Sequence, residues 1–180
     1  MKPAMGKSRS ALGTDRGASL VELAMALPLL MVLILGMVSS GISYNHNLSL
    51  SHTAREAARH GATLPVTNFA SMDLWLDEIA ARAVEDATGS LDPGTPGLII
   101  CVAYVHPNGS LATDSTRSRT NNGGTVSYAG SSCFVDGRPP DERRVQVSVT
   151  RETTFNALVF STNITLDSEG VSRFEAGFGL

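Results

Sequence analysis

The chain contains four histidines, and histidine is the side chain that most often serves as a metal ligand or as a general base near neutral pH. His46, His52, His60 and His106 do not form a ligand set at the sequence level. His52 and Glu56 would share a helix face at i,i+4, which favours a surface pair over a catalytic dyad. The sequence also lacks a phosphate-binding loop, a nucleophile elbow and a zinc-protease motif. We therefore expect no catalytic residue, no metal site and no cofactor, and no motif supports a membrane-tethered hydrolase.

Glu22 is an acidic side chain at the edge of a long apolar run. The run from Leu23 to Ile42 is apolar or small throughout, and no Asp, Glu, Lys or Arg occurs from Leu23 to Ala54. About twenty residues of α-helix cover roughly 30 Å, the thickness of a bilayer's hydrocarbon core, so the run can span a membrane. Glu22 then needs a partner, because a carboxylate in hydrocarbon costs several kcal/mol unless it is paired or neutralised. In the other interpretation, Glu22 lies among the lipid headgroups of an uncleaved anchor.

The charges around the apolar run predict its orientation. Both lysines and two arginines precede it, and a positive flank is retained in the cytoplasm, so the rest of the chain should be exported. Leaving out residues 1–17 changes the formal net charge from −3 to −6 and removes every lysine, which argues against nucleic-acid binding. A secretory signal peptide is the competing interpretation. The run is longer than a typical signal-peptide core, however, and no clear small-x-small cleavage site follows it.

Gly17 lies five residues before Glu22, between the basic leader and the apolar run. This arrangement resembles the processing site of type IV prepilins, and the resemblance implies that a prepilin peptidase cuts after Gly17. Glycine suits such a site because the enzyme must approach the backbone closely. The cut would free an α-amine on Ala18. In pilin-like assemblies the glutamate at this position is thought to pair with the amine of a neighbouring subunit, which would give Glu22 its partner.

Two stretches carry a more specific resemblance. The first is RGASLVELAMALPLL at residues 16–30, with Pro28 six residues after the glutamate, and the second is TAREAARHG at residues 53–61. They are similar to the opening and to the Ala-Arg-Glu-Gly-Ala-Arg element of TadE-like proteins, pseudopilins of the tight-adherence (Tad, or Flp) pilus system. The matching residues of the second stretch are Ala54, Arg55, Glu56, Ala57, Ala58 and Arg59, with Ala57 where glycine is more usual.

The resemblance covers about the first third of the chain and implies a function. It implies a minor pilin-like subunit in the inner membrane, with its N-terminus in the cytoplasm and its head outside, or extracted into a pilus. Its partners would be other pilin-like or pseudopilin subunits, the pilus assembly platform and the prepilin peptidase, with no small-molecule substrate. The alternative is a single-span envelope protein whose exported head binds a partner outside any pilus.

Small residues in the apolar run suggest how the helix packs. Gly36 with Ser40, and Ser39 with Ser43, share a helix face and would let a second helix approach closely. Pro28 is tolerated in the first turns if neighbours satisfy the carbonyl that it frees. These features favour lateral assembly in the membrane, while the other interpretation is a single-span helix without a specific partner.

The sequence predicts an α+β fold with a long N-terminal helix. Apolar and small residues recur every three or four positions beyond the membrane, so one helix should run from about Ala18 to Gly61, where Gly61 and Pro65 end it. The expected organisation is a leader at 1–17, a transmembrane helix at 18–43, its extramembrane continuation at 44–62 and an exported head at 63–180. A second, amphipathic helix should start after Asn68 or Ser71 and end near Gly89.

The rest of the head should contain a small antiparallel sheet of about three to four strands. Residues 97–105 form a compact apolar run, residues 144–150 alternate between valine and polar side chains, and residues 164–166 suggest a last strand. Residues 107–141 should form a long loop or an irregular hairpin, and residues 155–160 an apolar connection.

Cys101 and Cys133 both fall in the exported head, where oxidation is permitted. They can form a disulfide, which would close a loop of about thirty residues and stabilise the head by roughly 3 kcal/mol. The other interpretation is two buried thiols.

Overall fold

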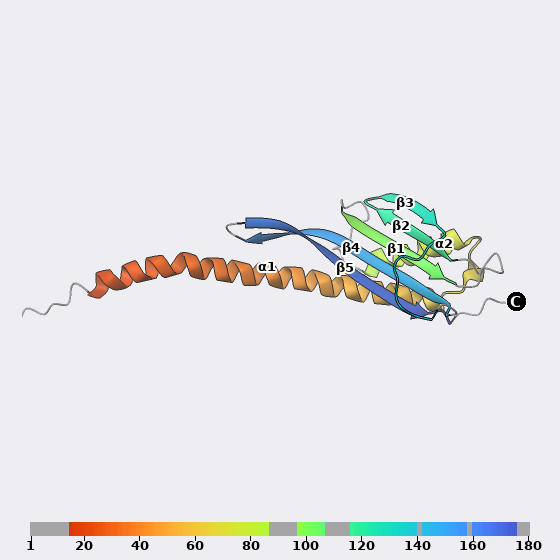
Figure 1. Ribbon diagram of the computed structural model, residues 1–180, viewed down its shortest axis with the longest axis horizontal. Helices are drawn as coiled ribbons and strands as arrows, with labels where there is room; N and C mark the ends of the chain where they lie inside the picture. Colours follow the sequence, from red (N-terminus) through yellow and green to blue (C-terminus); the bar gives the residue numbers. More distant parts are fainter. Residues whose placement is uncertain (1–14, 87–96, 107–115, 140–141, 158–159, 176–180) are drawn as a thin grey trace, which may run out of the picture.

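The structure is a computed structural model that describes residues 15–86, 97–106, 116–139, 142–157 and 160–175. It has a long helix at one end and a mixed head at the other (Figure 1). The helices are α1 (Asp15–Thr63), the short 3-10 helix η1 (Val66–Asn68) and α2 (Met72–Asp86). The strands are β1 (Leu98–Val105), β2 (Arg117–Asn122), β3 (Thr125–Ala129), β4 (Arg144–Ala157) and β5 (Phe160–Arg173). The predicted α+β class is confirmed.

Helix α1 forms one continuous spine of 49 residues, two residues longer at its C-terminal end than predicted. Gly61 does not end the helix. Its α-carbon lies where α1, α2 and β4 meet, and a Cβ there would come within 2.6 Å of Ile79 Cδ1 and 3.1 Å of Val145 Cγ1. Gly61 is therefore a packing residue, and the helix ends just before Pro65, whose ring cannot continue it.

Helix α2 begins after Ser71, one of the two residues expected to cap it. The Leu74 amide donates to Ser71 Oγ at 3.3 Å, which satisfies one of the free N–H groups at the helix start. The helix ends at Asp86, and Gly89, its predicted end, lies outside the described residues.

The sheet has five antiparallel strands in the order β3-β2-β1-β4-β5, against the three to four that were predicted. The additional strands come from the segment expected to be a loop or irregular hairpin, which contains the regular β2–β3 hairpin. The segment expected to be an apolar connection is instead strand backbone at residues 155–157 and 160. As a result β4 and β5 are 14 residues each, and they project beyond the other strands along α1 (Figure 1).

The core lies between one face of the sheet and the two helices. The C-terminal half of α1 (the upper half) packs on β4 and β5, and α2 packs on β1 and β2. Trp75 is fully buried, makes edge-to-face contacts with Tyr104 and Phe174, and donates from Nε1 to the Leu64 carbonyl at 3.0 Å. The largest fully buried side chains are Trp75, Tyr104, Leu76, Ile79, Leu98, Ile100, Gln146, Val102, Val145, Val147 and Val149.

Candidate functional site

The N-terminal half of α1, up to about Ser43, is exposed although it is apolar; it is called the lower half from here on. Large side chains such as Leu20, Met25 and Leu33 are more than half exposed. The helix is long and apolar enough to cross a membrane, and no residue of its most apolar stretch is buried. A soluble protein would bury such a surface in its core, because apolar area in contact with water is unfavourable. This half of the helix therefore needs an apolar environment that the described residues do not provide.

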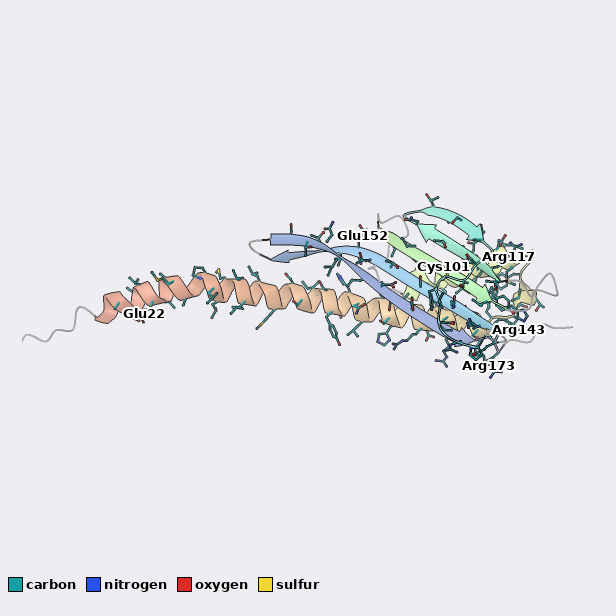
Figure 2. All side chains as sticks on the ribbon, viewed as in Figure 1. Glu22, Cys101, Arg117, Arg143, Glu152 and Arg173 are labelled. Carbon is teal, nitrogen blue, oxygen red and sulfur yellow. A yellow bond between two sulfur atoms is a disulfide. The ribbon has the colours of Figure 1, made fainter. Side chains whose placement is uncertain are left out.

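The residues predicted for processing lie at the start of this exposed stretch. Gly17, Ala18 and Glu22 are all exposed and already helical, because α1 begins at Asp15. Figure 2 shows Glu22 near the N-terminal end of the spine, at the opposite end of the molecule from Arg143 and Arg173. Among the described residues, the Glu22 carboxylate has no hydrogen bond or ion pair. A partner for it has to come from outside this part of the chain.

The predicted helix-packing residues follow along the same spine. Gly36, Ser39 and Ser43 are half-buried, while Ser40 and Pro28 are exposed. With a period of 3.6 residues, Gly36 and Ser43 lie on the same side of α1 as the residues that pack on the head. A Cβ at Gly36 would meet no atom within 4 Å, so the surface there is open. Packing of a second helix on this face stays a prediction.

The element at residues 54–59 divides into two faces. Ala54, Ala57 and Ala58 are buried against the head, whereas Arg55, Glu56 and Arg59 are exposed. On the buried side, β5 approaches the helix very closely at one point.

That close approach is at Gly170. A Cβ on Gly170 would overlap the carbonyl group of Ala54, so only a glycine lets β5 lie against the α1 backbone there. Beside it, Ser51 Oγ and Ser168 Oγ form a hydrogen bond of 2.7 Å. Gly170 was missed at the sequence level, because a single glycine in a strand pattern does not reveal which element approaches it.

The outward side of the same element borders a shallow pocket lined by His52, Thr53, Arg55, Glu56 and Arg59. Thr53 is buried and the other four residues are exposed, so the pocket is open to solvent. In the described residues, no group of three or more His, Cys, Asp or Glu side chains could hold a metal ion.

The head carries a second organised region, in which the segment 130–139 crosses the outer face of the sheet. Cys101 on β1 is joined to Cys133, with the two α-carbons 5.8 Å apart. Three residues further on, Asp136 Oδ2 accepts from Arg144 Nε at 2.6 Å and from Gln146 Nε2 at 2.8 Å. The segment is therefore attached to β1 by a covalent bond and to β4 by a buried ion pair.

The environment of Asp136 favours its charged form. Burial raises the pKa of this carboxyl, but hydrogen bonds from Gln146, from the Arg138 amide and from Arg144 outweigh burial, so its pKa lies below the ordinary value of 3.8. Gln146 also binds the Phe134 carbonyl and the Cys133 amide, at 3.1 and 3.2 Å. These contacts hold the segment in a single position.

Comparison with known proteins finds one family. The family described as TadE-like protein matches residues 17–59, which include the processing residues, the exposed apolar stretch and the element at 54–59. No curated protein and no solved structure matches the chain. The resemblance seen in the sequence is thereby confirmed over residues 17–59, which lie within α1 and are similar to the TadE-like family.

Proposed function

We propose that the protein is a minor pilin-like subunit that takes part in assembling a Tad/Flp-type adhesive pilus and acts through its surfaces. The observation that supports this most is the division of α1 into two parts. Its lower half is apolar and exposed and is preceded by Gly17 and Glu22, while its upper half forms the core of the head. Such a spine can hold a head outside a membrane at a fixed height.

The energetics favour insertion of the lower half. Ten leucine, isoleucine and valine residues lie from Leu23 to Ile42. At the centre of a membrane-spanning helix each such residue contributes about −0.3 to −0.6 kcal/mol to the free energy of membrane insertion. Together the ten residues therefore favour insertion by several kcal/mol. A charged residue at the centre costs about 3 kcal/mol, and Glu22 lies at the edge, where the cost is smaller. The free energy gained by inserting the apolar residues is therefore larger than the cost of inserting Glu22.

The basic residues before the span support an orientation with the N-terminus in the cytoplasm and the head outside the inner membrane. A prepilin peptidase that cuts after Gly17 would leave Ala18 as the first residue, and its new α-amine could pair with Glu22 of a neighbouring subunit. Other pilin-like subunits and the assembly platform are the expected partners. The subunit would either remain in the membrane as part of this assembly or be extracted into the pilus.

The test is the identity of the mature N-terminus. Intact-mass spectrometry of the native protein should show a chain that begins at Ala18. A Gly17→Leu variant should keep its leader, because a bulky side chain prevents close approach to the backbone at the cut. A Gly13→Leu variant, which changes a leader glycine away from the cut, should be processed normally and serves as the control.

Two results would contradict the proposal. Native protein that starts at Met1 would favour the envelope protein with a partner-binding head, in which Glu22 should also be replaceable without effect. Native protein that has lost the whole apolar run would identify a secretory signal peptide.

A further inference from the structure

Residues 153–157 of β4 and 160–165 of β5 form a ribbon of two strands that the rest of the sheet does not support. The last backbone contact with the segment of β1 is made by the Glu152 amide, which donates to the Gly97 carbonyl at 3.2 Å. From there to the pair of Ala157 and Phe160, the described ribbon pairs only within itself. A two-stranded ribbon is at best marginally stable in water, so this one needs further support.

The ribbon extends along α1 toward the N-terminal, apolar half of the helix (Figure 1). A hydrogen bond of 2.7 Å between Ser168 Oγ and Ser51 Oγ fixes the height of β5 on the spine. The strand from Ser168 back to Phe160 is about 26 Å long, whereas Ser43 lies only about 12 Å of helix below Ser51. Even if only half of the strand's length lies along the helix axis, the ribbon reaches the level of Ser43.

The surface of the bilayer lies at this level in the proposed membrane placement. The predicted span, residues 18–43, is about 39 Å of helix, which exceeds the roughly 30 Å of a hydrocarbon core. Its last residues, from Ser39 to Ser43, are small or polar except for Ile42, so they suit the interfacial layer, which is about 5 to 8 Å thick. The far end of the ribbon therefore meets the interfacial layer of the bilayer.

The ribbon is free of charged residues, as α1 is at the same height. No Asp, Glu, Lys or Arg occurs from Thr153 to Leu166, and none occurs in α1 from Leu23 to Ala54. Residues 155–160 are apolar in sequence apart from Asn156. Strand edges that face water commonly carry charges that discourage association. A ribbon without charges and with an apolar far end suits a lipid interface, where apolar area can be buried.

The backbone of the ribbon limits how deeply it can enter the bilayer. The outer edges of its two strands carry N–H and C=O groups that the described residues do not pair, and open sheet edges are not tolerated in hydrocarbon. Water and lipid headgroups in the interfacial layer can form these hydrogen bonds. Ser161, Thr162 and Asn163 are exposed and polar, which also suits this layer.

We propose that the far end of the ribbon rests in the interfacial layer of the bilayer that α1 spans, and so gives the head a second attachment to lipid. A lipid surface is favoured over a neighbouring protein because lipid is present at this height whenever α1 spans the membrane. The attachment lies on one side of α1, so it sets the direction in which the helix tilts. This inference rests on the membrane placement in the proposed function.

Site-specific labelling of the full chain tests the contact. The two cysteines of the sequence form the Cys101–Cys133 disulfide, so an added cysteine is the single free thiol. A Ser161→Cys variant carries a fluorophore near the far end of the ribbon and is reconstituted in phosphatidylcholine vesicles that contain nitroxide-labelled lipid. A nitroxide on the headgroup should quench this fluorophore strongly, and a nitroxide deep in the acyl chain should quench it less.

Three further variants serve as references. A label on Leu33→Cys, in the middle of the apolar run, should be quenched by the deep nitroxide. A label on Ser127→Cys, exposed on β3, is the matched control and should be quenched by neither lipid. Thr162→Cys is a second labelling site on the ribbon, and the emission of buried Trp75 reports that each labelled chain is folded.

An added charge then tests the cause. Phe160→Asp should reduce the quenching of the Ser161→Cys label to that of the Ser127→Cys control, because a carboxylate opposes burial of the ribbon in an apolar layer. Val135→Asp also replaces an apolar residue by an acid, at an exposed position away from the ribbon, and should leave the quenching unchanged.

A ribbon label that neither lipid quenches overturns this inference, and it leaves the proposed function standing when the Leu33→Cys label is still quenched by the deep nitroxide. If that ribbon label is also shielded from water, a neighbouring subunit covers the ribbon in place of lipid. Quenching that survives Phe160→Asp overturns the inference as well. A Leu33→Cys label that the deep nitroxide does not quench would instead contradict the membrane placement, and with it the proposed function.

Discussion

Asp136 shows how one carboxylate can hold a loop in place. Its side chain and that of Arg144 are 6% and 9% exposed, so both charges are shielded from water and their hydrogen bonds are stronger than those of a surface pair. An ion pair on the surface contributes about 0 to 1 kcal/mol, whereas removing one partner of a buried pair costs several kcal/mol, because the other charge is left uncompensated.

We therefore expect Asp136→Asn to lower the free energy of unfolding at neutral pH by roughly 3 kcal/mol. The wild-type pKa is lower in the folded chain than its ordinary value of 3.8. The stabilisation that ionised Asp136 gives the folded chain is thus complete above pH 3.8. It is lost as the pH falls below 3.8 towards the lower pKa of the folded chain. Thermal unfolding of the full chain in detergent, measured between acidic and neutral pH, should show this loss in the wild type and a flatter profile in the variant.

Asp73→Asn is the matched control, because Asp73 forms an exposed ion pair with Arg117. It should change the unfolding temperature only slightly. An Asp136→Asn variant as stable as this control at neutral pH would show that the buried pair does not hold the segment.

Sequence reasoning identified Cys101 and Cys133 as potential partners, but not the role of β4 beside them. Alternation in residues 144–150 predicted a strand whose polar side chains share one face, yet on that face Gln146 is fully buried and Arg144 nearly so. The pattern could show which residues share a face. It could not show that a segment about ten residues earlier in the chain would cover that face.

At the scale of elements, the main contact is that of β5 with the spine. Gly170 and Ala54 are 116 positions apart in sequence, and their backbones touch in the structure. The contact explains why the buried face of α1 is built from alanines at this level, since larger side chains would force β5 away from the helix.

A Gly170→Ala substitution should therefore destabilise the head. The added methyl group would meet backbone atoms of Ala54 and Arg55, which cannot rotate away as a side chain can. We expect a loss of about 1 to 3 kcal/mol, measured as a lower urea midpoint for the full chain in detergent. Gly130→Ala is the control, because its Cβ would come no closer than 3.7 Å to the Thr116 carbonyl oxygen. Equal effects of the two substitutions would contradict this explanation.

The helices were more predictable than the strands. Apolar residues at intervals of three and four marked both helices to within a few residues where their ends are described. The β2–β3 hairpin was missed as regular structure, because Arg117–Asn122 is polar and is held by pairing with β1 and by the contact of Arg119 with Asp77 on α2. Such long-range pairing leaves no periodic signal in the strand itself.

At the scale of the whole molecule, α1 belongs to two environments. Its residues up to about Ser43 contribute little to the core, whereas Leu50, Ala54, Ala57, Ala58 and Ala62 are core residues of the head. The sequence predicted this division, because the apolar run gives way to an amphipathic pattern. The orientation of the sheet on the spine was not predictable, since it depends on which glycine lets a strand approach.

Deletion of residues 1–43 should release a soluble head that keeps its core. Trp75, the single tryptophan of the chain, is fully buried, so its fluorescence emission should remain blue-shifted and should shift to the red on unfolding. A deletion of residues 1–55 removes Leu50 and Ala54 from the core as well, and we expect it to unfold at a lower temperature. A red-shifted emission of the shorter deletion at room temperature would show that the head needs the lower spine to fold.

The projecting ends of β4 and β5 bear on how the head meets the bilayer. Beyond Glu152 and Thr165 the two strands pair only with each other and extend along α1 toward its N-terminal end as a narrow ribbon (Figure 1). While the chain advances from Ser168 in β5 to Glu175 just after it, α1 advances from Ser51 to Ala62. If this ratio holds along β5, the far end of the ribbon at residues 157 and 160 lies roughly 20 Å from Ser51, measured along α1 toward its N-terminus. In the proposed membrane placement the span ends at Ser43, about 12 Å along the helix from Ser51, so the far end of the ribbon would lie at the level of the bilayer.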